Sequence, residues 1–397
     1  MDFAWRENFC VAGELLRAEL KGVEDMNKMA RVIRPEFAPG SRTLAISDIH
    51  GNLPFFRSVL DKICFSFTDN LVLVGDLFEK GDDSLALLRY VMELGRTHHV
   101  YSLCGNCDDI DRAFLENRPN IDEKLWPVFR YWKGHNLILQ LGAELGLRPE
   151  RPEDLPALRS AILRERPAEA EFLLTMPHIL TAGRYIFVHG GIPREDGLDG
   201  LEAYPCMKND DFLGQGLSFD RWVVVGHWPV TLYRTDIPSA APLIDRRRHI
   251  ISIDGGCVLK VDGQLNALIV PDVDRNDFTW TAYDGLPTVT ALAHQDPSAD
   301  SLNIRWSDSA VEVLREEGDC CWCRHLSTGR ELWILKEYIY PRQSDGHLHC
   351  EDSTDYCLPV EPGDRLSLVR RCSRGILAKK NGVTGWYFGP TAEDKNK

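Results

Sequence analysis

The sequence predicts an α/β protein with a small all-β domain at its carboxyl end, and three observations support this prediction. Short apolar runs typical of strands alternate with helix-period segments between residues 43 and 103. The stretch from about 110 to 180 is rich in Leu, Arg, Glu and Pro and lacks strand-like runs. From residue 301 onward, short β-rich runs are separated by closely spaced Gly, Asp and Asn turns.

The main domain is expected over residues 41–274. It begins with TLAIS, LVLVG and HVYSLCG, and a helix-period segment follows each of the first two, which predicts a βαβαβ unit. A helical insertion is expected over about 110–180. Strands resume with RYIFVHG, RWVVVGH and HIISIDGG, and KVDGQLNALIV is interpreted as a hairpin continuation.

The flanking parts have a different character. Residues 1–40 are expected to form a helical extension that ends at the Pro- and Gly-containing RPEFAPGS, and residues 275–300 are expected to be a linker. Residues 301–397 are expected to form a small β-barrel. Because TGRELWI and GVTGWYF resemble two copies of one element, two tandem barrels are an alternative.

Composition and charge exclude several classes of protein. The 46 basic and 60 acidic side chains give a formal charge of -14, which repels nucleic acids and anionic membranes. No stretch approaches the roughly 20 apolar residues of a membrane span, and the first residues lack a signal-peptide pattern. We therefore expect a cytoplasmic protein without nucleic-acid or membrane partners, in which most of the 12 cysteines are reduced.

Metal-compatible side chains follow five of the predicted strands. These residues are Asp48, His50, Asp76, Asn106, His189 and His227. The carboxyl ends of strands in an α/β sheet are where ligands bind, so we expect these side chains to converge. Asp, His and Asn together suit two divalent metal ions that clamp a phosphate. Taken one at a time, a Gly-Asp turn or a single His is more often structural, but five such strand ends in one chain favour the metal site.

The blocks SDIHGN, GDLFEKGDDS, GNCDD, VHGG and VVGHWP, in this order, resemble the calcineurin-like metallophosphoesterases. The second block is most similar to the phosphoprotein phosphatase and dinucleoside-tetraphosphatase branch. The resemblance implies an α+β sandwich with four α/β/β/α layers. It also implies that Asp48 and His50 hold a first metal, that Asp76 bridges both, and that Asn106, His189 and His227 hold the second.

The activity that the resemblance implies is metal-dependent hydrolysis of a phosphate monoester, in a phosphoprotein or a small phosphorylated metabolite, by a hydroxide shared between two metals. Manganese is the expected metal, with iron, zinc and nickel as alternatives. Phosphodiesterase or dinucleoside polyphosphate hydrolase activity is a second interpretation. A third is a catalytically weak metal-binding module that recruits a peptide through its barrel.

Cys107 stands where the phosphatase branch usually has a catalytic His, with Asp108 in the partner position and Glu79 in place of an Asp. These three residues are the predicted catalytic group, and losing the general acid typically costs 10²–10⁴-fold. The thiol is alternatively a small buried side chain, half of a redox pair with Cys104, or a metal ligand. Lys80 replaces the usual Arg, and the predicted phosphate contacts are Lys80, Arg194 and Arg221.

The carboxyl-terminal region has its own set of metal-type residues. They are Cys320, Cys321, Cys323, His325, His347, His349 and Cys350. We favour a hydrophobic core over a zinc site, because alternate side chains of CCWCRHL point to opposite faces of a strand. The region also resembles bacterial Src-homology-3-like domains, which implies a peptide ligand. Trp333, Trp386 and Tyr387 would line its groove or fill its core.

Overall fold

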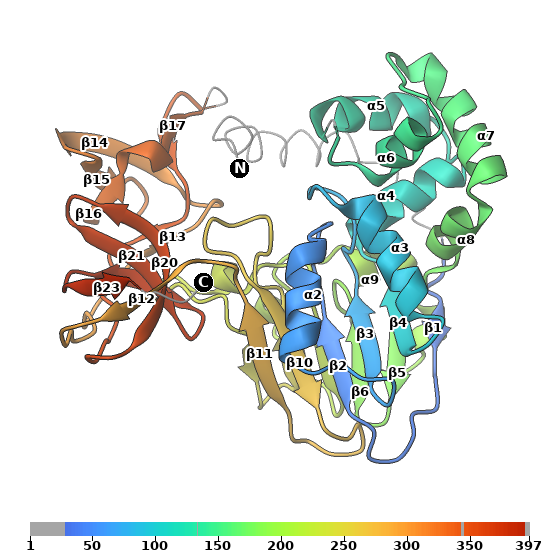
Figure 1. Cartoon of the computed structure of the whole chain (residues 1–397), viewed down its shortest axis with the longest axis horizontal. Coiled ribbons are helices and arrows are strands. Elements are labelled where there is room, and N and C mark those ends of the chain that lie inside the picture. Colours follow the sequence, from blue (N-terminus) through green and yellow to red (C-terminus); the bar gives the residue numbers. More distant parts are fainter. Residues whose placement is uncertain (1–27, 133, 343–344, 394–397) are drawn as a thin grey trace.

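The computed structural model describes residues 28–132, 134–342 and 345–393, and two stacked β-sheets form the centre of the main domain (Figure 1). One sheet has the strand order β11-β10-β2-β3-β4 and the other β1-β5-β6-β7-β9-β8. The first consists of Thr279–Tyr283, Leu265–Val270, Thr43–Ile46, Asn70–Val74 and His99–Leu103, in that order. The second consists of Val32–Ile33, Ile179–Ala182, Tyr185–Val188, Trp222–Val225, Ile250–Ser252 and Leu243–Asp245.

Apolar side chains fill the space between the sheets and cover both outer faces. Val72, Val74, Phe187 and Val224 lie between the sheets. Helices α2 (Leu53–Lys62) and α3 (Ser84–Leu94) pack on the outer face of the first sheet. Because both faces of the central strands are buried, their sequences are continuously apolar. The predicted mixed α/β fold, with a separate all-β region, is confirmed.

The parallel strands bring their carboxyl ends to one edge. β2, β3 and β4 are parallel neighbours, and so are β6, β7 and β9. The hairpin expected in 260–270, with its turn at Asp262–Gly263, is wrong, because residues 257–262 form no strand before β10. β10 instead pairs antiparallel with β2 and β11, so the segment 253–264 crosses from one sheet to the other.

The insertion is helical, as expected, and Figure 1 shows it above one end of the sheets. Its helices are α4 (Asn106–Leu115), α5 (Ile121–Trp132), α6 (Leu137–Glu144), α7 (Leu155–Glu165) and α8 (Pro167–Thr175), with a 3₁₀ turn η1 at Pro152–Asp154. A second, thin outer layer on the other sheet contains α9 (Ala203–Met207), η2 (Leu198–Gly200) and η3 (Phe212–Gln215). No helix in the described part of the chain is long and apolar enough to span a membrane.

The amino-terminal and linker segments differ from expectation. Residues 1–27 of the expected helical extension lie outside the described residues, and 28–40 contain the strand β1, which pairs with β5. The expected linker 275–300 contains two strands. β11 extends the first main-domain sheet, whereas β12 (Thr288–Ala291) joins a sheet of the carboxyl-terminal region. The apolar and β-branched residues of β11 pair with the main domain, and those of β12 pair with the carboxyl-terminal region. The polar residues between them therefore separate two strands and do not form a linker without secondary structure.

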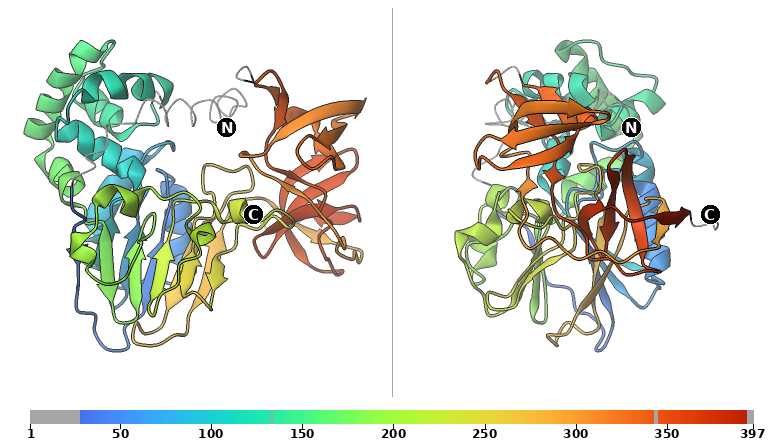
Figure 2. Two further views of the ribbon diagram at one scale, coloured as in Figure 1. Left: turned by 180° about the vertical axis from the view of Figure 1, so that it is seen from behind. Right: turned by 90° about the vertical axis from the view of Figure 1, so that its left-hand side faces the viewer.

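The carboxyl-terminal region, called the tail below, contains two five-stranded antiparallel sheets with separate cores (Figure 2). Their orders are β16-β15-β14-β18-β17 and β22-β21-β20-β12-β23. The first sheet consists of Glu331–Leu335, Cys320–His325, Ala310–Glu317, Leu348–Cys350 and Ile339–Pro341. The second consists of Val383–Tyr387, Gly375–Lys380, Arg365–Cys372, Thr288–Ala291 and Thr391–Glu393. The two similar sequences TGRELWI and GVTGWYF supply β16 and β22, the last strands of two equivalent meanders.

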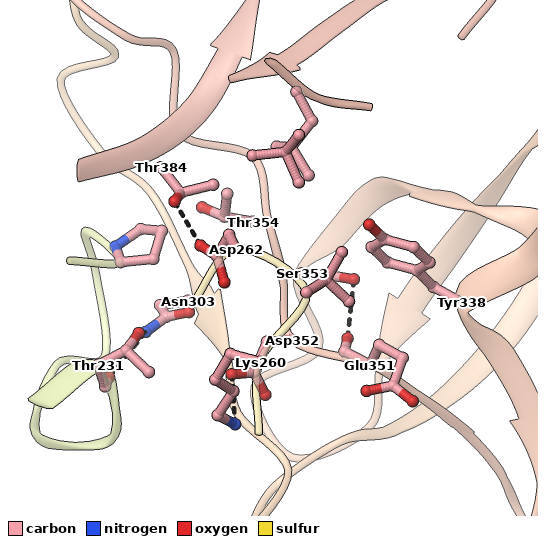
Figure 3. A pocket seen from close by; sticks show the side chains of 14 residues that line it. Thr231, Lys260, Asp262, Asn303, Tyr338, Glu351, Asp352, Ser353, Thr354 and Thr384 are labelled. Atoms are coloured by element: carbon pink, nitrogen blue, oxygen red, sulfur yellow. Dashed lines mark hydrogen bonds and ion pairs between the residues drawn. The ribbon is translucent and has the colours of Figure 1, made fainter. Parts of the chain in front are cut away.

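The tail packs directly on the main domain. A two-stranded sheet of β13 (Asn303–Ile304) and β19 (Ser353–Thr354) lies beside the 3₁₀ turn η4 (Val230–Tyr233) of the main domain. Lys260 Nζ forms an ion pair of 2.6 Å with Asp352 Oδ2 across this interface. Figure 3 shows the polar pocket that the two parts enclose, which has a volume of about 30 Å³.

Candidate active site

Six side chains from five segments meet at the carboxyl ends of the parallel strands. Each follows its strand by at most four residues: Asp48 and His50 after β2, Asp76 after β3, Asn106 after β4, His189 after β6 and His227 after β7. We call these six residues the donor cluster. All are buried or half-buried, and they come from both sheets.

Asp76 lies at the centre of the donor cluster. Its Oδ1 is 3.2 Å from His189 Nε2, and its Oδ2 is 3.9 Å from His50 Nε2. His50 Nε2 is also 4.0 Å from Asp48 Oδ1. The backbone N–H of His227 donates to Asp48 Oδ2 at 3.1 Å, which ties the two sheets together at the site. The sequence blocks therefore converge as predicted.

The backbone of this region is held in unusual conformations. Asp48, His50, Asp76 and His227 have φ values of 54°, 50°, 52° and 66°, in the left-handed region that L-residues rarely occupy. A Cβ on Gly105 would lie 2.2 Å from the Asp76 carboxylate. Such strain persists only where the surrounding structure enforces it, and it is concentrated at functional sites.

Several donor atoms of the cluster are buried without a hydrogen-bond partner among the described residues. They are both ring nitrogens of His50, Asn106 Oδ1 and His189 Nε2. Unpartnered buried polar atoms are costly, and a bound cation would satisfy them. His189 Nδ1 lies 2.8 Å from the Val74 carbonyl oxygen, which fixes the ring and leaves Nε2 as an electron-pair donor. The residues present therefore fit divalent metal ions.

Burial and neighbouring charges shift the pKa values of three residues of the donor cluster. Burial, then the nearby Asp254 carboxylate, holds the pKa of Asp48 well above its usual range. Burial alone would lower the pKa of His189, but Asp76 and Asp48 raise it to about 9. Burial lowers the pKa of His50 to about 3.

Two of the predicted catalytic residues, Asp108 and Glu79, accept hydrogen bonds that join separate segments of the chain. Asp108 is 1% exposed and accepts three backbone N–H groups, from Leu77 at 3.0 Å, Phe78 at 3.2 Å and Gly105 at 2.8 Å. It therefore joins the loop after β3 to the start of α4. These contacts give the buried carboxylate a positioning role, and its expected role as the partner of a general acid stays a prediction.

Glu79 is also fully buried, and it points into the insertion. Its carboxylate accepts the Leu137 N–H at 2.8 Å and the Asn136 Nδ2 at 2.7 Å. Burial raises the pKa of Glu79 to about 7. The residue links the insertion to the loop after β3, which is a positioning role, and its expected catalytic role stays a prediction.

Cys107 faces the donor cluster. Its Sγ, a His50 ring nitrogen and an Asp76 oxygen lie within 4.8 Å of one another. Burial holds the pKa of the thiol well above its usual range. Cys107 and Cys104 are both free thiols, so the structure contains no redox-linked pair at this place. A role as a small buried side chain and a role as a metal ligand are both compatible with the position of Cys107.

Lys80 is the one predicted phosphate contact that the structure places at the cluster. Burial alone would lower the pKa of its ammonium, but the adjacent Cys107 and Asp76 raise it. Arg221 instead precedes β7, at the end of the strand opposite His227, and pairs with Glu195 at 3.6 Å. The exposed Arg194 donates to the Asp196 carbonyl at 3.1 Å. Arg221 therefore lies at the opposite end of β7 from His227, and a phosphate contact by Arg194 stays a prediction.

Three further residues belong to the site but were not predicted. Asp254 follows β9 in the same strand-then-Asp pattern as Asp76, and this pattern was a signal for it. Asp210 Oδ1 lies 2.8 Å from His227 Nε2, and so orients that ring. Lys208 Nζ lies 3.2 Å from the same nitrogen. Lys208 and Asp210 lie outside the strand-end pattern, so no sequence signal marked them.

The Cys and His residues of the tail are mainly structural. Cys320, Cys321, Cys323 and Cys350 are buried in the core of the first tail sheet. His325 contacts Thr328 and the Asp308 carbonyl, and His349 contacts Ser309 and Asp345. His347 is exposed. The interpretation as core agrees with this structure, although Cys320 also lies near Asp319 and Cys372.

The predicted aromatic residues of the tail divide between core and surface. Tyr387 is fully buried, and its hydroxyl donates to the Ala293 carbonyl at 2.9 Å. Trp333 and Trp386 line a groove of about 210 Å³. Trp322 and Phe388 complete its aromatic lining.

Two bacterial proteins of known name are similar in sequence to this chain. Bis(5'-nucleosyl)-tetraphosphatase PrpE [asymmetrical] of Bacillus thuringiensis is 24% identical over 256 residues, which are 58% of this chain and 90% of that protein. The protein of the same name from Geobacillus sp. is 25% identical over 254 residues, with the same coverage.

Solved structures that align with the chain include a protein serine/threonine phosphatase from Saccharomyces cerevisiae, at 11% identity and a TM-score of 0.38, over 71% of this chain and 91% of that one. A metallophosphoesterase from Sphaerobacter thermophilus aligns at 18% identity and a TM-score of 0.34, over 61% and 87%. The family model of the calcineurin-like phosphoesterases matches residues 41–251, more than half of the chain. The chain belongs to the calcineurin-like phosphoesterase family.

Proposed function

We propose that this chain is a metal-dependent phosphoesterase whose active centre is the donor cluster. The observation that carries the proposal is that six strand-end donors from two sheets converge, with ring and amide atoms buried and unpartnered among the described residues. Asp48, His50 and Asp76 would hold one divalent ion, and Asp76, Asn106, His189 and His227 the other. When bound, two such ions neutralise phosphate charge and make water a nucleophile at neutral pH.

The protein's own groups would bind and orient the ester. Lys80 and Lys208 place two ammonium groups on the rim of the cluster, where they would pair with phosphate oxygens. Both offer point charges rather than the bidentate fork of Arg, so they suit phosphate groups held in more than one orientation. Buried Cys107 supplies no ready proton, since burial favours its neutral thiol and raises its pKa. Esters with good leaving groups should therefore react fastest.

A phosphate monoester is the first candidate substrate, and manganese is the first candidate metal. A dinucleoside polyphosphate is the second candidate. It is favoured by the relatives named as asymmetrical bis(5'-nucleosyl)-tetraphosphatases, which match along 90% of their length. The leaving group of such an anhydride is a nucleotide, a much weaker base than an alkoxide, which agrees with the missing general acid.

The test is hydrolysis by the manganese-loaded protein of four esters: p-nitrophenyl phosphate, bis-p-nitrophenyl phosphate, a phosphoserine peptide and diadenosine tetraphosphate. We expect fast release from an aryl ester or the tetraphosphate and poor turnover of phosphoserine. Preference among the first, second and fourth distinguishes monoesterase, diesterase and polyphosphate hydrolase. Silence on all four, with two metals bound per chain, would overturn the proposal.

A further inference from the structure

Two hairpin turns, one from each five-stranded sheet of the tail, meet at one point. Gly318 and Asp319 form the turn between β14 and β15, and Ser373 and Arg374 form the turn between β20 and β21. The N–H of Ser373 donates to Asp319 Oδ2 at 3.0 Å, and its hydroxyl donates to Asp319 Oδ1. A Cβ on Gly318 would lie 3.3 Å from Ser373 Oγ. The two turns are therefore in close contact and join the two tail sheets.

A cysteine lies next to each of these turns. Cys320 is the first residue of β15, and Cys372 is the last residue of β20. Their Sγ atoms and a carboxylate oxygen of Asp319 all lie within 4.8 Å of one another. Cys320 Sγ also lies 3.6 Å from Asp319 Oδ1. We call Asp319, Cys320 and Cys372 the turn cluster, in which two free thiols and a carboxylate from two sheets converge.

The turn cluster differs in exposure from the other cysteines of the first tail sheet. Cys321, Cys323 and Cys350 are buried in the core of that sheet. Cys320 is also buried, but it lies at the end of its strand, beside the half-buried Cys372 and the exposed Asp319. An ion could therefore reach the turn cluster from solvent without opening the core.

The donor atoms of the turn cluster suit zinc. Thiolate sulfur and carboxylate oxygen are both ligands of Zn²⁺, and thiolates favour zinc over magnesium, calcium or manganese. Two sulfur atoms that bind a tetrahedral zinc ion at about 2.3 Å are about 3.8 Å apart, which agrees with the separation of at most 4.8 Å between the two Sγ atoms. Three protein ligands would leave the fourth position to water.

The contacts of Asp319 orient its carboxylate and leave its charge uncompensated. Hydrogen bonds from Ser373 lower the pKa of Asp319, so the carboxylate is ionised at neutral pH. Among the described residues it forms no ion pair, because the neighbouring Arg374 pairs with Glu317 at 3.8 Å and stacks on Trp333. Hydrogen bonds of this kind hold a carboxylate in place as a metal ligand.

A disulfide is the alternative for two adjacent thiols, but the carboxylate makes it less favourable than a metal site. Burial, followed by the adjacent Cys372 and Asp319, raises the pKa of the Cys320 thiol to about 12. Disulfide formation requires a thiolate, which a nearby negative charge disfavours. A divalent cation would instead offset the negative charge of all three groups and displace the thiol protons as it binds.

We propose that Asp319, Cys320 and Cys372 form a zinc site that clamps the two tail sheets together. The site consists only of tail residues, so it is independent of the donor cluster and of the proposed phosphoesterase function. A bound ion would connect β15 to β20 and so fix the turn that carries Arg374. Because Arg374 and Trp333 both line the tail groove, the ion would also hold one wall of that groove in place.

The first test uses Co²⁺ as a spectroscopic substitute for zinc in the reduced, metal-free, full-length protein. Cobalt bound to thiolates gives an intense near-ultraviolet charge-transfer band, which Asp, Asn and His ligands do not give. We expect this band, and we expect Zn²⁺ to abolish it by displacing the more weakly bound cobalt. Cys372→Ser should lose the band. Cys357→Ser, a half-buried tail thiol outside the turn cluster, is the matched control and should keep it.

A second variant guards against misfolding at Cys372. Asp319→Asn changes an exposed side chain and should weaken cobalt binding to the thiols by at least about tenfold, because even groups that only support a ligand contribute that much. A band that Cys107→Ser abolishes and Cys372→Ser retains would assign the thiolate to the donor cluster and refute the proposal. The absence of any thiolate band in the unmodified protein would refute it as well.

The second test measures how zinc protects the thiols. The reduced, metal-free protein is treated with iodoacetamide, with and without Zn²⁺, and the modified cysteines are identified by peptide mass spectrometry. At a zinc concentration about ten times the apparent Kd, we expect modification of Cys372 to slow about tenfold and that of Cys357 to stay unchanged. Equal rates at Cys372 with and without zinc would contradict the proposal. A disulfide between Cys320 and Cys372 that forms in air even with zinc present would contradict it too.

Discussion

The strand ends of the main domain and the strand β15 of the tail both carry several side chains that bind metals in proteins. In the main domain, Asp76 and His189 lie beyond the last residue of their strands, and His189 Nε2 has no hydrogen-bond partner among the described residues. In the tail, Cys321 and Cys323 lie within a strand and pack in its core. The position of a residue relative to the strand, rather than its type, therefore determines what it can bind.

The hydrogen bonds of the histidines show the same difference. His50 has no hydrogen-bond partner for either ring nitrogen among the described residues, and His189 has none for Nε2. Both ring nitrogens of His325, in the tail, have partners within 3.0 Å: Thr328 Oγ1 and the Asp308 carbonyl. A histidine whose two ring nitrogens both bond to the chain has no free ring nitrogen for a ligand. A buried ring nitrogen without such a partner can bind one.

The largest expected effect comes from removing one histidine of each kind. His189→Ala should lower phosphoesterase activity more than about a hundredfold, because even groups that only support a metal ligand cost 10–100-fold. It should also reduce the metal content measured by elemental analysis after dialysis. His325→Ala is the matched control, and its metal content and activity should equal those of the unmodified protein. Loss of metal from the His325 variant would reverse our interpretation of the two regions.

The sequence located the residues of the donor cluster better than the residues that support them, because the former follow regular strands. Asp48, Asp76 and His227 follow regular apolar strands, so periodicity locates them. Lys208 lies in an irregular segment after α9, and only the tertiary fold brings it to His227. Arg221 shows the converse, because a residue close in sequence to the fifth block lies at the far end of β7.

The fold was predicted to a similar extent. Strands and helices with strong periodicity were identified, but pairing between distant strands was not. The segment 260–270 was interpreted as a hairpin because Asp262–Gly263 is a typical turn sequence, whereas β10 is placed by its contacts with β2, more than 200 residues earlier. In the same way, β12 has a short strand pattern whose partner β20 lies far away in the chain, whereas β11 pairs with the preceding strand β10.

The second prediction concerns the residues that position the donor cluster. Asp108→Asn should lower the free energy of unfolding by about 2–3 kcal/mol, because an amide NH₂ would replace one of the oxygens that accept buried N–H groups. The control is Asp82→Asn, an exposed carboxylate in the loop before α3, which should change stability by less than about 0.5 kcal/mol. Urea denaturation of the metal-free proteins measures both. Equal stability of the two variants would show that Asp108 does not support the loops.

The smallest expected effect is a pH dependence at Glu79. Its folded-state pKa is about 7, raised by burial above the usual 4.5, so between these values the folded state holds a proton that the unfolded state releases. The contribution of Glu79 to stability is therefore full below about pH 4.5 and is lost as the pH rises through 7. Glu79→Gln removes this titration, so the Tm of the variant minus that of the unmodified protein should become more positive from pH 5 to 8.

The offset in Tm at any one pH also includes the altered contacts with Asn136 and Leu137, so the trend with pH is the measurement that reports the buried proton. Glu93→Gln, an exposed position on α3, supplies the baseline, and its Tm difference should not rise with pH. A flat difference for Glu79→Gln in the metal-free protein would mean that the carboxyl is ionised in the folded state. The link between the insertion and the loop after β3 would then be an anion stabilised by the Asn136 amide and the Leu137 N–H, not a neutral acid.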